Sequence, residues 1–174
     1  MNRHFTITTV LLAAGIVALF STNVQAQNDR GRVSAGDRKF AMEAAHGGIA
    51  EVRLGELAEQ KGSSEFVRRF GHRMVEDHGK ANDDLQSVAS NMGLTLPTEP
   101  NGEQRELMAR LRRLHGAAFD AAYIRAMKMD HQMDIAEFKK EARMGREAGI
   151  RRFASRTLPI IQGHYRMLMN RRMM

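Results

Sequence analysis

The sequence predicts an all-α protein, a four-helix bundle with a short helical connector between the second and third helices. Apolar residues recur at steps of three and four along four long segments, which is the period of a helix that packs one face on a core. Between these segments the chain carries Gly and Pro, which end helices, and no segment shows the alternation of a strand. With 174 residues, 43% of them hydrophobic, we expect one domain with a single core.

The first 26 residues have the composition of a signal peptide. Arg3 and His4 give a basic start, an apolar run follows over residues 7–20, and Ala26 ends a small-residue cleavage site. The apolar run is roughly 14 residues long, whereas a membrane-spanning helix needs about 20. We therefore expect cleavage after Ala26, export to the periplasm or the medium, and no membrane span in the mature chain.

Charge and cysteine content narrow the possible partners. The chain has no Cys, which excludes a disulfide framework and thiol catalysis. Its formal net charge is +7, but the Arg pairs are spread along the chain with acidic residues between them. With two Tyr and no Trp there is no aromatic platform for a nucleic acid, so we expect no nucleic-acid partner. An anionic surface of the cell envelope is a more natural neighbour for an exported basic protein.

The mature chain reads as helices separated by breaks. Polar residues 27–35 are expected to be a flexible start, and the bundle domain is expected over residues 36–174. We expect helices over residues 36–61, 63–92 and 117–146 and from about residue 150, with a connector over residues 103–115. Pro159 lies inside the fourth helix and removes a backbone hydrogen bond, so it should kink or divide that helix.

Each of the four long helices carries a polar side chain in the middle of its packing face. Residues at equal distances from a short turn lie at similar heights on antiparallel helices, so these side chains should meet near the bundle centre. Neutral imidazoles with one carboxylate suit Zn, Fe, Mn or Cu, and Asp77 and Asp134 could orient the imidazoles as hydrogen-bond acceptors. The candidate metal ligands are Glu51, His78, His131 and His164.

A competing interpretation needs no metal. Buried histidines are commonly hydrogen-bonded core residues, and a Glu–His network can serve only to fix one packing arrangement. An oxidising di-iron centre is disfavoured, because the Glu-x-x-His pairs of di-iron bundles are absent: Val75 and Ile161 stand three residues before His78 and His164. The sequence leaves the metal site and the structural network both open.

The methionines near His131 make copper a candidate metal. The run MKMDHQM over residues 127–133 brings thioethers next to His131, and thioether with imidazole selects copper. Alternate residues of a helix face different ways, so Met127 can share the face of His131 while Met129 and Met133 form another. The other interpretation of these methionines is flexible core filling.

Four strings, in order, are similar to a family of exported bacterial proteins, the domain of unknown function 4142. The match covers about residues 38–168, and the strings read FAMEAAHGGIAEVRLGELAEQK, FVRRFGHRMVEDHGKANDDL, LHGAAFDAAYIRAMKMDHQ and LPIIQGHYRML. The resemblance implies a ferritin-like four-helix bundle with a crossover between helices two and three. It also implies a set of recurring positions, which here are Glu51, Asp77, His78, Phe119, Asp120, Tyr123, His131, Pro159 and His164.

This sequence departs from the family pattern at one position, and the resemblance implies no particular activity. Gly71 stands where an Ala is usual in the family, which we expect only to loosen that helix. The interpretation we favour is an exported bundle that acts as a metal-binding or envelope-stress accessory protein through its central Glu/His cluster. The alternatives are a structural or interaction protein of the envelope and, third, a metal-dependent enzyme.

Overall fold

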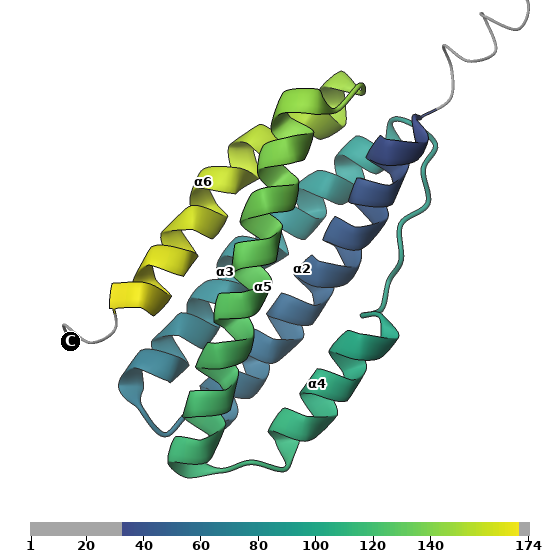
Figure 1. The fold of residues 1–174 in the computed structure, drawn as a ribbon. Helices are drawn as coiled ribbons and strands as arrows, with labels where there is room; N and C mark the ends of the chain where they lie inside the picture. Colours follow the sequence, from purple (N-terminus) through teal and green to yellow (C-terminus); the bar gives the residue numbers. More distant parts are fainter. Residues whose placement is uncertain (1–32, 171–174) are drawn as a thin grey trace, which may run out of the picture. The chain divides into compact units, whose positions relative to one another are not determined.

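The computed structural model describes residues 33–170, which form five helices and no strand. The expected signal peptide and residues 27–32 lie outside this range. Figure 1 shows four long helices side by side with a shorter fifth, which confirms the all-α bundle and its helical connector. The helices are α2 (Ala35–Lys61), α3 (Glu65–Ser90), α4 (Gly102–Arg112), α5 (Gly116–Met144) and α6 (Ala148–Asn170).

The long helices form two antiparallel hairpins, α2–α3 and α5–α6, joined by a crossover that contains α4 (Figure 1). The crossover returns along α2, because Arg53 pairs with Glu99 at 2.6 Å and the Lys61 ammonium donates to the Arg112 carbonyl at 2.8 Å. The chain therefore travels back along the bundle before α5 begins. As a result α5 runs in the same direction as α3.

An aspartate near the start of α5 holds the turn of the first hairpin. The Asp120 carboxylate accepts hydrogen bonds from the Ser63 and Ser64 amides at 2.9 and 2.8 Å and from the Ser63 hydroxyl at 2.7 Å. The Arg68 guanidinium donates to the Gly62 carbonyl at 2.8 Å and so closes the turn from the other side. These contacts satisfy free groups at two helix ends.

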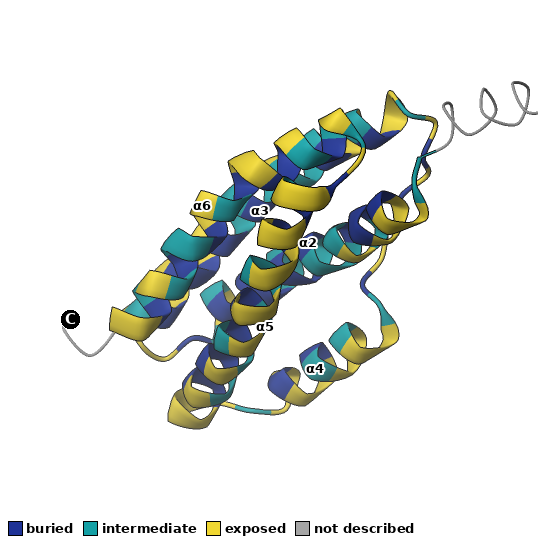
Figure 2. Ribbon diagram, turned by 45° about the horizontal axis from the view of Figure 1, so that its top comes forward, coloured by how far each residue is buried: buried dark blue, intermediate teal, exposed yellow. Residues whose placement is uncertain are grey.

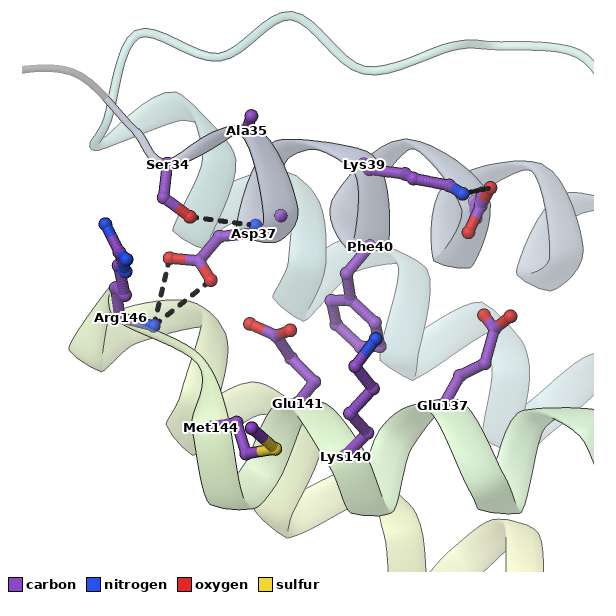
Figure 3. A pocket seen from close by; sticks show the side chains of 12 residues that line it. Ser34, Ala35, Asp37, Lys39, Phe40, Glu137, Lys140, Glu141, Met144 and Arg146 are labelled. Atoms are coloured by element: carbon purple, nitrogen blue, oxygen red, sulfur yellow. Dashed lines mark hydrogen bonds and ion pairs between the residues drawn. The ribbon is translucent and has the colours of Figure 1, made fainter.

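The second hairpin repeats this arrangement with an aspartate from the start of α2. Asp37 accepts from the Arg146 amide at 3.1 Å and the Glu147 amide at 2.7 Å, as Figure 3 shows for Arg146. The Arg151 guanidinium donates to the Gly145 carbonyl at 2.8 Å. Each hairpin thus fixes the turn of the other, and this sets the relative height of all four long helices.

The buried faces of the helices turn inward (Figure 2) and form two apolar clusters stacked along the bundle. One cluster contains Phe40, Leu85, Phe138, Phe153 and Ile161. The other contains Leu54, Phe70, Met74, Tyr123, Met127 and Leu168. On every long helix the predicted polar residue falls between the two clusters, so a polar layer divides the core.

Two glycines let the backbones of α2 and α3 approach each other closely. A Cβ atom built on Gly71 would lie 2.6 Å from the Gly55 carbonyl oxygen and 2.8 Å from the Ala58 Cβ atom. A Cβ atom on Gly55 would meet the Gly71 carbonyl oxygen at 2.6 Å. The expectation that Gly71 only loosens its helix is therefore wrong, because Gly71 is required by the contact between the two backbones.

Pro159 does not divide the fourth helix, because α6 continues from Ala148 to Asn170 with the proline inside it. The missing amide leaves the Ser155 carbonyl without its helical partner, and both residues are exposed, so water can hydrate that carbonyl. None of the helices within residues 33–170 has the length and apolar character that crossing a bilayer requires.

Candidate metal centre

The four candidate ligands come together in the polar layer. Each is supplied by a different helix and is almost completely buried, with 0 to 5% of its surface exposed: Glu51 (α2), His78 (α3), His131 (α5) and His164 (α6). Burial of four polar side chains between two apolar clusters is unfavourable unless their polar atoms are satisfied. The contacts that they make therefore decide what the cluster does.

The three imidazoles point one nitrogen each toward a common centre. The His78 Nε2 and His131 Nε2 atoms lie 3.3 and 3.4 Å from the His164 Nδ1 atom. Two nitrogens bound tetrahedrally to one Zn²⁺ at 2.0–2.1 Å stand about 3.3 Å apart. The spacing of the inward nitrogens therefore matches that of ligands on one metal ion.

The other nitrogen of each imidazole faces a carboxylate. The His78 Nδ1 atom lies 2.6 Å from Glu51 Oε2, the His131 Nδ1 atom 3.5 Å from Glu51 Oε1, and the His164 Nε2 atom 2.9 Å from Asp77 Oδ2. Carboxylate partners of this kind place the ring proton on the outer nitrogen and fix the orientation of the ring. The inner nitrogens then carry lone pairs.

The imidazoles are neutral at neutral pH. Burial lowers the pKa of His78 to about 4 and that of His164 to about 4, and the Asp77 hydrogen bond only partly opposes this at His164. Burial, with the neighbouring His78 and His164, also holds the pKa of His131 well below its ordinary range. With their protons on the outer nitrogens, three neutral rings direct lone pairs at one another, which is repulsive unless a cation or a proton lies between them.

The Glu51 carboxyl group lies near a second carboxyl group, that of Asp130. Burial, and then the charge of Asp130, raise the pKa of Glu51 well above its ordinary value. A protonated Glu51 would donate to His78 Nδ1, and the His78 Nε2 proton would then donate to His164 Nδ1. This relay is the metal-free arrangement of the cluster, and it requires the Glu51 proton that a bound cation would displace.

Of the two residues predicted to orient the imidazoles, Asp77 contacts one and Asp134 does not. Asp77 contacts His164 and also pairs with Arg73 at 3.0 Å, so it acts as the acceptor that the sequence predicts. Asp134 makes no hydrogen bond to an imidazole among the described residues. Burial and the nearby charges of Glu51 and Asp130 raise its pKa well above the ordinary range.

Sequence reasoning missed Asp130. Its Oδ2 atom lies 3.9 Å from His131 Nδ1, on the side that faces Glu51. The signal was present in the spacing, because Asp130 stands two helical turns after Tyr123 and therefore borders the apolar stripe of that helix. Tyr123 itself is buried against Phe70, with ring centroids 6.3 Å apart.

The methionine run does not gather at the centre. Met127 is buried in the apolar cluster that also holds Phe70, whereas Met129 and Met133 are 61% and 59% exposed. Met127 therefore shares the buried side of its helix with His131, as the helical spacing predicts. The two exposed thioethers lie away from the imidazoles.

The fold and the cluster define a helical bundle with a buried histidine–carboxylate centre. The chain belongs to the family described as "Domain of unknown function (DUF4142)", whose sequence profile matches residues 22–170. In fold it is similar to the crystal structure of a DUF305 fragment from Deinococcus radiodurans, with a TM-score of 0.69 at 14% identity, over 80% of this chain and 96% of that one. A search of curated proteins gave no significant match.

Proposed function

We propose that this protein is an exported metal-binding protein that holds one divalent transition-metal ion between His78 Nε2, His131 Nε2 and His164 Nδ1. The observation that carries the proposal is the convergence of three buried imidazoles, each with one nitrogen directed inward and the other facing a carboxylate. In this assignment Glu51 accepts a hydrogen bond from His78 Nδ1 and does not bind this ion. The surrounding carboxylates also offset the charge of the cation.

The donor set favours some metals over others. Imidazole nitrogen suits Zn, Cu, Fe and Ni, whereas Mn prefers oxygen ligands, and Cu²⁺ and Zn²⁺ stand above Mn²⁺ and Fe²⁺ in affinity for nitrogen sites. We therefore place Zn²⁺ and Cu²⁺ ahead of Fe and Mn.

The small space around the cluster favours metal binding over catalysis of a reaction. The cavity that touches both Glu51 and His78 measures only ≈ 20 Å³, which is room for about one water molecule. A larger hollow of ≈ 610 Å³ borders Asp77 and His164 on the outside of α3 and α6, and it offers an ion a route toward the centre. A substrate would have to displace the Asp77–His164 contact to reach the inner nitrogens.

Metal binding by variants tests the proposal. The protein is purified without a histidine tag, stripped with a chelator and dialysed against Zn²⁺ or Cu²⁺, and bound metal is counted by mass spectrometry. His164→Ala should weaken binding by at least about 100-fold, because loss of even an outer-shell partner costs 10–100-fold in affinity. His72→Ala is the matched control, since His72 lies on the exposed side of α3.

The competing function is a packing device in which the Glu51–His78 and Asp77–His164 contacts only fix the bundle. It would be supported, and the metal proposal overturned, if wild type and His164→Ala retained the same metal with the same affinity. Circular dichroism of each variant confirms that a loss of binding is not a loss of fold.

A further inference from the structure

A second group of polar atoms lies on the far side of His131 from the three inward nitrogens. Glu51 Oε1, Asp130 Oδ2 and His131 Nδ1 are each sealed from solvent, and none has a hydrogen-bond partner within residues 33–170. The His131 Nδ1 atom lies 3.5 Å from the Glu51 oxygen and 3.9 Å from the Asp130 oxygen. Each of these three residues offers one possible ligand atom that lies within 4.8 Å of those of the other two.

Three unsatisfied buried atoms facing each other require an explanation, because leaving even one such group unpaired costs about 1–3 kcal/mol. Hydrogen bonds from His131 do not supply it, because separations of 3.5 and 3.9 Å from its Nδ1 atom to the two oxygens are too long for good hydrogen bonds. Two carboxylate oxygens and one imidazole nitrogen are together a donor set for a divalent cation. The separations of 3.5 and 3.9 Å are also in the range spanned by two ligands on one ion.

We propose that a second divalent cation binds between Glu51 Oε1, Asp130 Oδ2 and His131 Nδ1, so that His131 bridges two metal ions. This inference rests on the proposed function, because it takes the first ion to lie at His131 Nε2. When the second ion binds, its bond to Nδ1 replaces the N–H bond, and the proton leaves to bulk water. His131 then bridges the ions as an imidazolate.

The surroundings of His131 suit this role. The ring is fully buried, and its outer side meets two carboxylates, whose negative charge offsets the second cation. The Asp130 side chain is 29% exposed although its Oδ2 atom is buried, so it reaches from solvent to the site. Glu51 serves both positions, with Oε2 held by His78 and Oε1 directed at the second ion.

Stoichiometry of Zn²⁺ binding tests the second site. Wild type should bind two equivalents, and Asp130→Asn should bind one, because its amide keeps the shape of the side chain but loses the anionic ligand. His131→Ala should lose the second equivalent and weaken the first. Asp83→Asn, which alters an exposed carboxylate on α3, is the control and should still bind two.

The bridge has its own signature in Cu²⁺ titrations followed by electron paramagnetic resonance. In wild type the second equivalent of Cu²⁺ should diminish the signal of the first, because two copper ions joined by an imidazolate are magnetically coupled. In Asp130→Asn the signal of the first equivalent should persist.

The outcomes separate this proposal from the preceding one. One equivalent in wild type, unchanged in Asp130→Asn, overturns the second site and leaves the first intact. Two equivalents in Asp130→Asn also overturn it, and two uncoupled copper ions in wild type overturn the bridge. One equivalent that is lost in Asp130→Asn would place a single ion at the carboxylates and overturn the two-ion arrangement. No binding by wild type at all overturns both proposals.

Discussion

The His78 Nε2 atom lies 3.3 Å from the His164 Nδ1 atom, although 86 residues separate the two histidines. His78 belongs to the first hairpin and His164 to the second, and the hairpins are joined only by the crossover. The inward nitrogens thus assemble only when both hairpins are docked. A ligand that binds them binds the folded state and not the separated hairpins.

Zn²⁺ should therefore raise the thermal stability of wild type. At a free concentration of 100 times the dissociation constant, a ligand specific for the folded state stabilises it by about 2.7 kcal/mol. For a domain of this size that corresponds to an increase in Tm of about 5–10 °C. Differential scanning calorimetry with and without Zn²⁺ measures it. The shift should vanish in His164→Ala and persist in His72→Ala, and an equal shift in both variants would contradict the site.

Asp120→Ala should destabilise the protein strongly. The substitution removes three hydrogen bonds to a largely buried carboxylate and leaves the Ser63 and Ser64 amides unpaired. Hydrogen bonds to charged groups contribute about 1.5–3 kcal/mol each and are not additive, so we expect a loss of about 2–4 kcal/mol. Urea unfolding measures the change. A loss no greater than that of the exposed control Asp83→Ala would show that Asp120 does not hold this turn.

Glu141→Gln should stabilise the protein at pH 8 but not at pH 4. Burial, and then the hydrogen bond and charge of Asp37, raise the pKa of Glu141 to about 7 from an ordinary value of 4.5. Between these values the unfolded chain ionises Glu141 while the folded protein keeps it protonated, so wild-type stability falls as pH rises through this window and levels off above about 7. Gln cannot ionise, so the variant does not lose this stability as the pH rises.

The difference in unfolding free energy between Glu141→Gln and wild type should grow from near zero at pH 4 to about 1–3 kcal/mol at pH 8. Urea unfolding across this range supplies the curve. Glu137→Gln, at the same pocket (Figure 3), is the matched control. A flat curve for Glu141→Gln would mean that the carboxyl of Glu141 titrates normally.

Gly71→Ala should destabilise the bundle although Ala favours helices. Helix propensity alone would stabilise the variant by about 0.8–1.0 kcal/mol. The added Cβ atom would lie 2.6 Å from the Gly55 carbonyl oxygen, and overpacking of this kind costs about 1–3 kcal/mol. We expect a net loss of up to about 2 kcal/mol in urea unfolding. Gly79→Ala, which meets open space on the same helix, should be stabilising, and the same gain at position 71 would contradict the close approach.

Much of the fold was predictable because it follows from local rules. The helical period, the Gly and Pro breaks and the polar residue in the middle of each packing face indicate the four long helices and their shared polar level. Of the two effects expected of Pro159, division of the helix is wrong, because α6 continues through an exposed position where water can hydrate the freed carbonyl. The role of Gly71 could not be predicted either, because it depends on the distance between two backbones.

The residues of the candidate site could be predicted from the sequence, but the directions of their side chains could not. Spacing along each helix indicates that Glu51, His78, His131 and His164 share a layer, but it does not say which ring nitrogen points inward. That choice follows from the carboxylates, and both Asp77 and Asp130 reach the imidazoles from the borders of their helical faces. The sequence therefore predicts the cluster, and three-dimensional contacts are needed to separate ligands from acceptors.

Anomalous X-ray diffraction at the zinc edge, on crystals of tag-free protein grown with Zn²⁺, tests the central claim most directly. We expect a peak inside the bundle about 2.0–2.1 Å from His78 Nε2, His131 Nε2 and His164 Nδ1. A bundle core without an anomalous peak, in crystals of a protein that has been given saturating Zn²⁺, would contradict the account.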